Sequence, residues 1–125
     1  MAVAATADSL GGVFAAVAEG LTAAMCDSIP PTGDRFEMRV RSESLEAALF
    51  DYLDECIYER DVRGVLPFDY RATVRRDGDE WVVEATARGV PLTDVTARDV
   101  KAVTYSEMEL VETDDGWRAY VVFDV

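Results

Sequence analysis

The stretch LEAALFDYLDECIYER, residues 45–60, decides the fold class of this chain. Apolar residues recur in it every three or four positions, which predicts an amphipathic helix from about Glu43 to Arg60. Ser42 is a candidate for the cap at its start. The apolar side of the helix consists of Leu45, Ala48, Leu49, Tyr52, Leu53, Cys56 and Ile57. So complete a stripe must be buried, and the rest of the chain has to supply its cover.

The residues before this stretch predict another helix and a strand. Apolar side chains recur at helical spacing over residues 9–26, with Ser9 or Asp8 as the cap. The segment Ile-Pro-Pro-Thr-Gly at 29–33 ends this helix, and the alternation over 35–41 predicts a strand.

After residue 67 the chain reads as strands. An Asp-Gly turn within residues 76–80 separates two alternating runs, and a turn at 114–116 separates a strand near 100–111 from a last strand over 117–125. We therefore expect a single α/β (α+β) domain over residues 1–125. The expected architecture has two layers, with two helices on one face of a mixed, mostly antiparallel sheet.

The charge balance limits the partners of the chain. It has 25 acidic against 12 basic residues, a net charge of −13, and Lys101 is its only lysine. An acidic, lysine-poor surface is suited to a salt-rich cytoplasm, so we expect a halophilic source and no direct binding of nucleic acid. Arginines on the strand surfaces are expected to pair with acids across the sheet; these are Arg71, Arg75, Arg76 and Arg88.

The other residue types exclude several classes of function. The chain has no histidine, which excludes Ser-His-Asp and Cys-His mechanisms and zinc sites that use histidine. Cys26 and Cys56 occupy apolar helical positions, so we expect buried free thiols. No apolar run approaches the roughly 18 residues of a membrane span, and no secretory signal is recognisable, so a cytoplasmic location is expected. An enzyme is disfavoured.

The C-terminus holds the best candidate site. The sequence ends Val-Val-Phe-Asp-Val, so the side chain of Asp124 lies next to the terminal carboxylate of Val125. Two negative groups this close at a sheet edge repel each other unless a cation lies between them, and their oxygens suit calcium or magnesium. Alone they are too few for calcium, and a solvated acidic terminus is the alternative.

With these residues in view, the chain resembles the archease family. The run Lys-Ala-Val-Thr-Tyr at 101–105 is similar to that family's Lys-Ala-(Val/Ile)-Thr-Tyr segment, and residues 121–125 are similar to its Val-Val-x-Asp-(Ile/Val) terminus. Residues 45–55 resemble its central helix. The resemblance covers nearly the whole chain.

The resemblance implies an accessory protein rather than an enzyme. Archeases assist the histidine-dependent RNA-splicing ligase that joins tRNA halves, by promoting its guanylylation and its multiple turnover. The implied calcium site uses Asp124 and Val125 together with an N-terminal aspartate. Asp51, Lys101 and Glu107 are expected to contact the ligase, on their positions rather than on a motif.

The N-terminus departs from the family pattern. A His-Thr-Ala-Asp segment normally precedes the first helix by roughly ten residues, whereas here Ala-Thr-Ala-Asp at 5–8 adjoins the helix directly. We therefore expect Asp8 to lie in a turn and not to be the third ligand, so that calcium binds weakly or not at all. Either a late start codon or a true truncation accounts for this start.

The alternative functions are a chaperone-like modulator of RNA-modifying enzymes, such as a tRNA methyltransferase, and a metal-dependent hydrolase.

Overall fold

The computed structural model describes residues 1–125 as two α-helices and six strands. In chain order the elements are β1 (Ala2–Ala7), α1 (Leu10–Met25), β2 (Asp34–Ser42), α2 (Leu45–Arg63), β3 (Val65–Asp77), β4 (Glu80–Pro91), the short 3-10 helix η1 (Leu92–Asp94), β5 (Ala102–Thr113) and β6 (Gly116–Asp124). Both predicted helices and all the predicted strands are present, with ends that differ by a few residues. The α+β class is confirmed.

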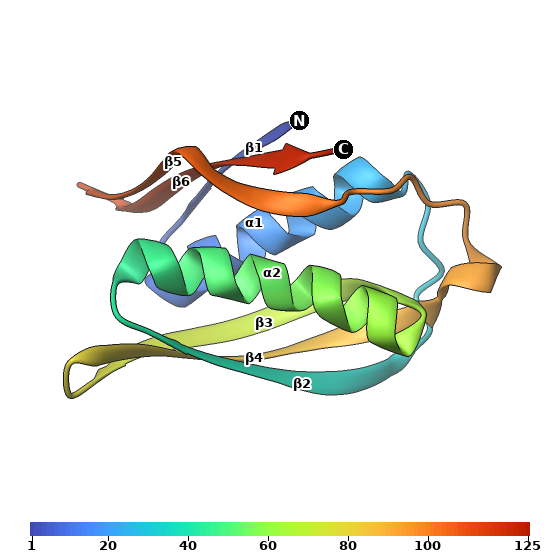
Figure 1. The fold of residues 1–125 in the computed structure, drawn as a ribbon, viewed down its shortest axis with the longest axis horizontal. Helices are drawn as coiled ribbons and strands as arrows, with labels where there is room; N and C mark the ends of the chain where they lie inside the picture. The colour runs from blue at the N-terminus through green and yellow to red at the C-terminus, as the bar shows by residue number, and fades with distance from the viewer.

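The strands form two sheets rather than the one that we expected. Sheet A has the order β1-β6-β5 and sheet B the order β2-β4-β3, and every pairing in both is antiparallel. Figure 1 shows the two helices lying between the sheets. Helix α1 packs against β1 and β3, and α2 packs against β2 and β5, so each helix contacts both sheets. The expected two-layer arrangement is wrong because each helix buries side chains on more than one side.

The helix ends show why each helix begins and ends where it does. The Ser9 hydroxyl accepts a hydrogen bond from the N–H of Gly12, and the Ser44 hydroxyl accepts one from the N–H of Ala47. The cap of α2 is therefore Ser44 and not Ser42, whose hydroxyl instead donates to Asp51 at 2.6 Å. Helix α2 ends at Gly64 in the left-handed conformation, which glycine adopts without steric cost.

A single core fills the space between the sheets. It contains 28 buried residues, and the rings of Phe14 and Tyr52 link α1 to α2 with their centroids 5.9 Å apart. One buried polar contact ties α1 to β3: the Thr22 hydroxyl lies 2.7 Å from both the Pro67 carbonyl and the Tyr70 hydroxyl. Neither helix is both long enough and apolar enough to cross a bilayer.

Replacing Gly11 by alanine should destabilise the fold. A Cβ at this position of α1 would lie 2.3 Å from the backbone carbonyl oxygen of Ala72 in β3, so the helix would have to move away from sheet B. We expect Gly11→Ala to lower the free energy of unfolding by about 1–3 kcal/mol, measured by urea denaturation. Helix propensity alone predicts the opposite sign, so a gain in stability would contradict the packing described here. Gly64→Ala is the control, because nothing lies within 4 Å of its Cβ and it tests backbone strain alone.

The two thiols should be unreactive in the folded protein. Cys26 and Cys56 are free and buried, as the sequence predicted, and burial raises the pKa of the Cys56 thiol far above its usual range. Because only the thiolate is nucleophilic, we expect no alkylation of Cys56 by iodoacetamide between pH 7 and 9 in native protein, and full alkylation in urea, as measured by mass spectrometry. Rapid alkylation of the native protein would show that the core is open around α2.

Candidate functional site

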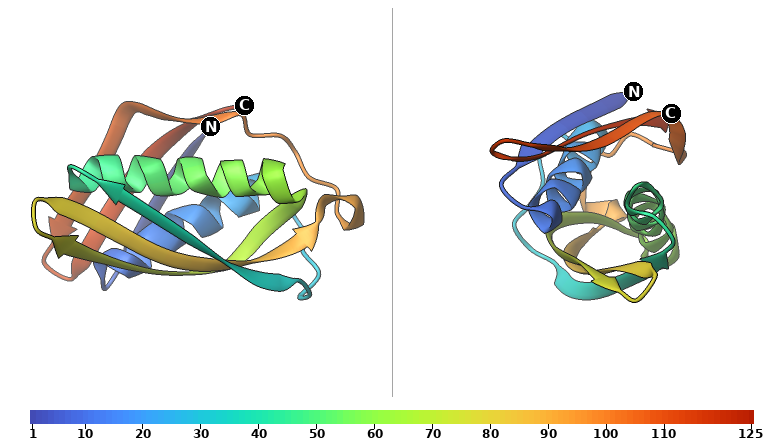
Figure 2. Two further views of the ribbon diagram at one scale, coloured as in Figure 1. Left: turned by 60° about the horizontal axis from the view of Figure 1, so that its bottom comes forward. Right: turned by 90° about the vertical axis from the view of Figure 1, so that its left-hand side faces the viewer.

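The C-terminal strand lies in the middle of sheet A. Strand β6 is flanked by β1 and β5, so the expected position of the final carboxylates at a sheet edge is wrong. The last strand is nevertheless built into the sheet, as the alternation predicted: Val121 and Phe123 are buried, and Asp124 and Val125 are exposed at its end. The two chain ends lie side by side in both Figure 1 and Figure 2.

Main-chain hydrogen bonds hold this end of the sheet together. The N–H of Phe123 donates to the carbonyl of Met1 at 2.7 Å, and the N-terminal ammonium donates to the Phe123 carbonyl at 3.2 Å. On the other side, the N–H of Lys101 donates to the carbonyl of Asp124 at 2.8 Å. Lys101, Asp124 and Val125 therefore lie together, and we call these residues with Met1 the terminal corner.

The terminal corner carries two cationic and two anionic groups without an ion pair among them. These groups are the ammonium groups of Met1 and Lys101 and the carboxylates of the Asp124 side chain and of the chain end. None of the ten ion pairs of the molecule includes any of them. Lys101 and Asp124 are exposed, so these groups are available to a cation or to a partner.

A buried arginine that the sequence analysis overlooked positions Lys101. Arg60, in the last turn of α2, donates a hydrogen bond to the carbonyl of Val100 at 3.0 Å and pairs with Asp99 at 3.3 Å and with Asp61 at 2.9 Å. It thus fixes the two residues that precede Lys101. One sequence signal could have revealed it, because Arg60 continues the apolar stripe of α2 three residues after Ile57, where a charge is unusual.

A second arginine ties the same segment to α1. The N–H of Arg98 donates to the Met25 carbonyl at 2.6 Å, and its guanidinium donates to the Ala24 carbonyl and to Asp27, both at 2.9 Å. This partner holds the pKa of Asp27 below its usual value. The segment from 98 to 101 is therefore held against the ends of both helices. As a result, Lys101 lies beside the end of β6.

The donors at the terminal corner suit calcium in type but not in number. Calcium takes six to eight oxygen ligands, and the corner offers one side-chain carboxylate and one terminal carboxylate. No group of three or more His, Cys, Asp or Glu residues is arranged to hold a metal. The residues of this chain alone do not fit a complete calcium site.

Asp8 does not supply the missing ligand. It follows Ala7, which pairs with Trp117 at the opposite end of the β1–β6 ladder from Asp124. The seven steps along the strand from Trp117 to Asp124 span about 23 Å, so the two carboxylates cannot share one cation. The register supports the expectation that Asp8 belongs to the turn before α1.

The other two predicted contact residues lie away from the terminal corner. Asp51 is half-buried on α2, where it accepts the hydrogen bond from Ser42. Glu107 is exposed in β5, with a positive φ of 63°. The structure brings Lys101 together with Asp124 and Val125, and it places Asp51 and Glu107 elsewhere.

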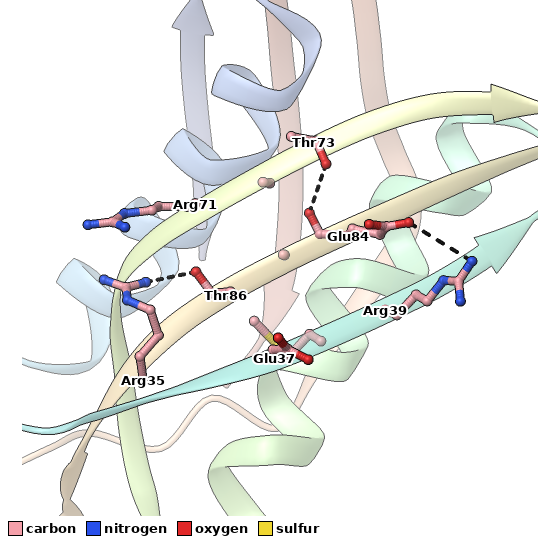
Figure 3. Close-up of a pocket in the computed structure, with 10 residues that line it drawn as sticks. Arg35, Glu37, Arg39, Arg71, Thr73, Glu84 and Thr86 are labelled. Carbon is pink, nitrogen blue, oxygen red and sulfur yellow. Dashed lines mark hydrogen bonds and ion pairs between the residues drawn. The ribbon is translucent and has the colours of Figure 1, made fainter.

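A cavity on sheet B is also remote from the terminal corner. It has a volume of about 730 Å³ and lies on the face of sheet B that points away from the helices (Figure 3). Its charged and hydroxyl-bearing lining residues are Arg35, Glu37, Arg39, Arg71, Thr73, Glu84 and Thr86. Both signs of charge alternate across it, which is typical of a solvated sheet surface.

The arginine pairing on this surface follows the sequence prediction only in part. Arg75 pairs with Glu84 at 3.0 Å across the strands, as expected. Arg71 forms no ion pair, and the other two arginines donate to main-chain carbonyls, Arg76 to Gly78 and Arg88 to Gly33 and Pro31. Arg76 and Arg88 bind these carbonyls because the carbonyl oxygens lie nearer to their guanidinium groups than any carboxylate does.

Comparison with known proteins supports the resemblance. The model of the Archease protein family (MTH1598/TM1083) matches residues 1–125. Protein archease of Methanosarcina acetivorans is 32% identical over 124 residues, which cover 92% of this chain and 85% of that protein. Protein archease of Thermococcus gammatolerans is 32% identical over 123 residues, which cover 94% of this chain and 86% of that protein.

Two solved structures share the fold. The solution structure of Methanobacterium thermoautotrophicum protein 1598 has a TM-score of 0.85 at 24% identity, over 99% of this chain and 91% of that one. The crystal structure of a Thermotoga maritima archease, described as a possible chaperone, has a TM-score of 0.67 at 21% identity, over 100% of this chain and 90% of that one. Since the family model spans every residue, the chain belongs to the archease family.

Proposed function

We propose that this protein activates the RNA-splicing ligase that joins tRNA halves, by promoting guanylylation of the ligase and its multiple turnover. Membership of the archease family supports this role. The observation that favours the terminal corner as the site is the main-chain hydrogen bond that places Lys101, the only lysine, beside Asp124 and Val125. These residues are 23 positions apart in sequence, and the pairing of β5 with β6 joins them.

The protein acts by contact and not by catalysis. The curated relatives are named protein archease, a name that states no catalytic activity. The description of the Thermotoga archease as a possible chaperone agrees with a protein partner.

The charge of the chain favours a basic surface on that partner. With a net charge of −13, the protein repels RNA over most of its surface and attracts a cationic protein surface. Salt screens this attraction beyond the Debye length, which is about 10 Å at 0.1 M salt and about 3 Å at 1 M, so close contacts decide the complex.

Addition of this protein should stimulate guanylylation of the ligase from the same organism, measured with labelled GTP. We expect Lys101→Ala to reduce the stimulation about fivefold or more, because it removes an exposed charge from the terminal corner. Arg118→Ala is the matched control, since Arg118 is another exposed base of sheet A without an ion pair. Lack of any stimulation by the unmodified protein would overturn the proposed function, and an effect on a tRNA methyltransferase instead would favour the chaperone-like alternative.

Calcium binds to the terminal corner weakly unless a further carboxylate joins it. Ala2 lies opposite Val122, and Met1 is hydrogen-bonded to Phe123, so a residue added before Met1 would lie opposite Asp124. Side chains that face each other across an antiparallel pair have Cβ atoms about 5 Å apart, close enough to share a cation. This position agrees with the place of the family's N-terminal aspartate.

An added aspartate at this position should create tight calcium binding. We expect the extension His-Thr-Ala-Asp before Met1 to raise calcium affinity on the order of tenfold or more over the unextended chain, as measured by calorimetry. The matched control is the extension His-Thr-Ala-Asn, which keeps the strand and removes the charge. Equal affinities for the three forms would rule out a calcium site at the terminal corner.

A further inference from the structure

A stacked aromatic pair, of which one ring is exposed, lies between α2 and sheet A. The rings of Phe50 in α2 and Tyr105 in β5 are stacked, with their centroids 4.3 Å apart and their planes at 3°. Tyr105 is 52% exposed although Phe50 covers one face of its ring. The other face of the ring is therefore open to solvent, and the core makes no use of it.

An interruption of the β5–β6 ladder presents this ring. Thr104 pairs with Val122 and Glu109 pairs with Tyr120, so residues 105–108 of β5 face a single residue of β6. This bulge frees Tyr105 from the regular pleat, and the positive φ of Glu107 belongs to the same bulge. Bulges of this kind re-aim a side chain, and here the side chain is an aromatic ring.

Two acidic residues of α2, Asp51 and Glu46, lie beside the stacked Phe50 in that helix. Asp51 directly follows Phe50 in α2, and Glu46 lies one helical turn before Phe50, whose ring is stacked on Tyr105. Burial raises the pKa of the Tyr105 hydroxyl, and the negative charges of Asp51 and Glu46 raise it further. One oxygen of Asp51 accepts from Ser42, which orients the carboxylate. Neither Asp51 nor Glu46 forms an ion pair within the chain.

We propose that the open face of Tyr105, together with Asp51, receives an arginine side chain of a protein partner. A guanidinium stacks flat on an aromatic face, and its fork of N–H donors matches a carboxylate at the edge of the ring. A planar ring backed by a second ring is rigid, so the contact costs little side-chain entropy. A lysine ammonium would gain the charge attraction but not the stacking, so the surface discriminates between the two bases.

This surface lies close to the terminal corner, because Lys101 immediately precedes the strand that carries Tyr105. Tyr105 follows Lys101 by four residues, about 13 Å in a strand, so one partner can contact both places. The identity of the partner as the RNA-splicing ligase rests on the proposed function. The chemistry of the Tyr105 surface does not depend on it.

The first test measures the affinity between this protein and the ligase by calorimetry at fixed salt. We expect Tyr105→Ala and Asp51→Asn each to weaken binding about fivefold or more, and Tyr105→Phe to bind as the unmodified protein does. Asp51→Asn keeps an oxygen that can accept from Ser42, so the fold is preserved. Tyr58→Ala is the matched control, because Tyr58 is 55% exposed on the same helix and lacks a stacked partner. Unchanged affinity in Tyr105→Ala would overturn the ligase contact.

A second test examines the surface without the ligase. A short peptide with one arginine is titrated while the ring resonances of Tyr105 are followed by NMR, with citrulline replacing arginine in the control peptide. We expect the arginine peptide alone to shift these resonances, and Asp51→Asn to reduce the shift. Absence of a shift would overturn the arginine site whatever the ligase does. If the unmodified protein fails to bind the ligase while the arginine peptide still shifts Tyr105, the proposed function fails and the site stands.

Discussion

The position of two helices between two sheets is the constraint on which the rest of this structure depends. Helices α1 and α2 each contact both sheets, and their side chains form the centre of the buried cluster. A helix covered on two sides needs apolar residues over more than one narrow stripe, and α1, rich in alanine, supplies them. The close contact of Gly11 with β3 shows how tightly this layer is packed. The sheets are held at a fixed separation because the helix layer cannot be compressed.

The terminal corner depends on this packing. Arg60 at the end of α2 and Arg98 beside the end of α1 fix the segment that leads into β5. That segment sets the place of Lys101 at the end of β6. A change in the packing of either helix end would therefore move Lys101 relative to Asp124 without touching either residue.

Both proposed contact surfaces, the terminal corner and the Tyr105 surface, lie on sheet A and α2. Lys101 of the terminal corner immediately precedes β5, and Tyr105 lies in the bulge of that strand, where its ring stacks on Phe50 of α2. The cavity on sheet B has a volume of about 730 Å³, but its charges alternate and several of them are paired. Size alone does not make that cavity the best candidate, since the unpaired groups with a defined geometry lie on the other sheet.

The sequence by itself determined the helices, most strand limits, the buried thiols and the acidic surface, because periodicity and composition are local properties. Its C-terminal pattern also predicted the last strand, over residues 117–125. Only the tertiary structure decided that the strands divide into two sheets and that β6 lies in the middle of one of them. It also decided that Lys101 meets Asp124, that Arg60 is buried, and that a bulge without glycine or proline exposes Tyr105. These features arise from pairings between residues far apart in the chain, and no local pattern encodes which strands will pair.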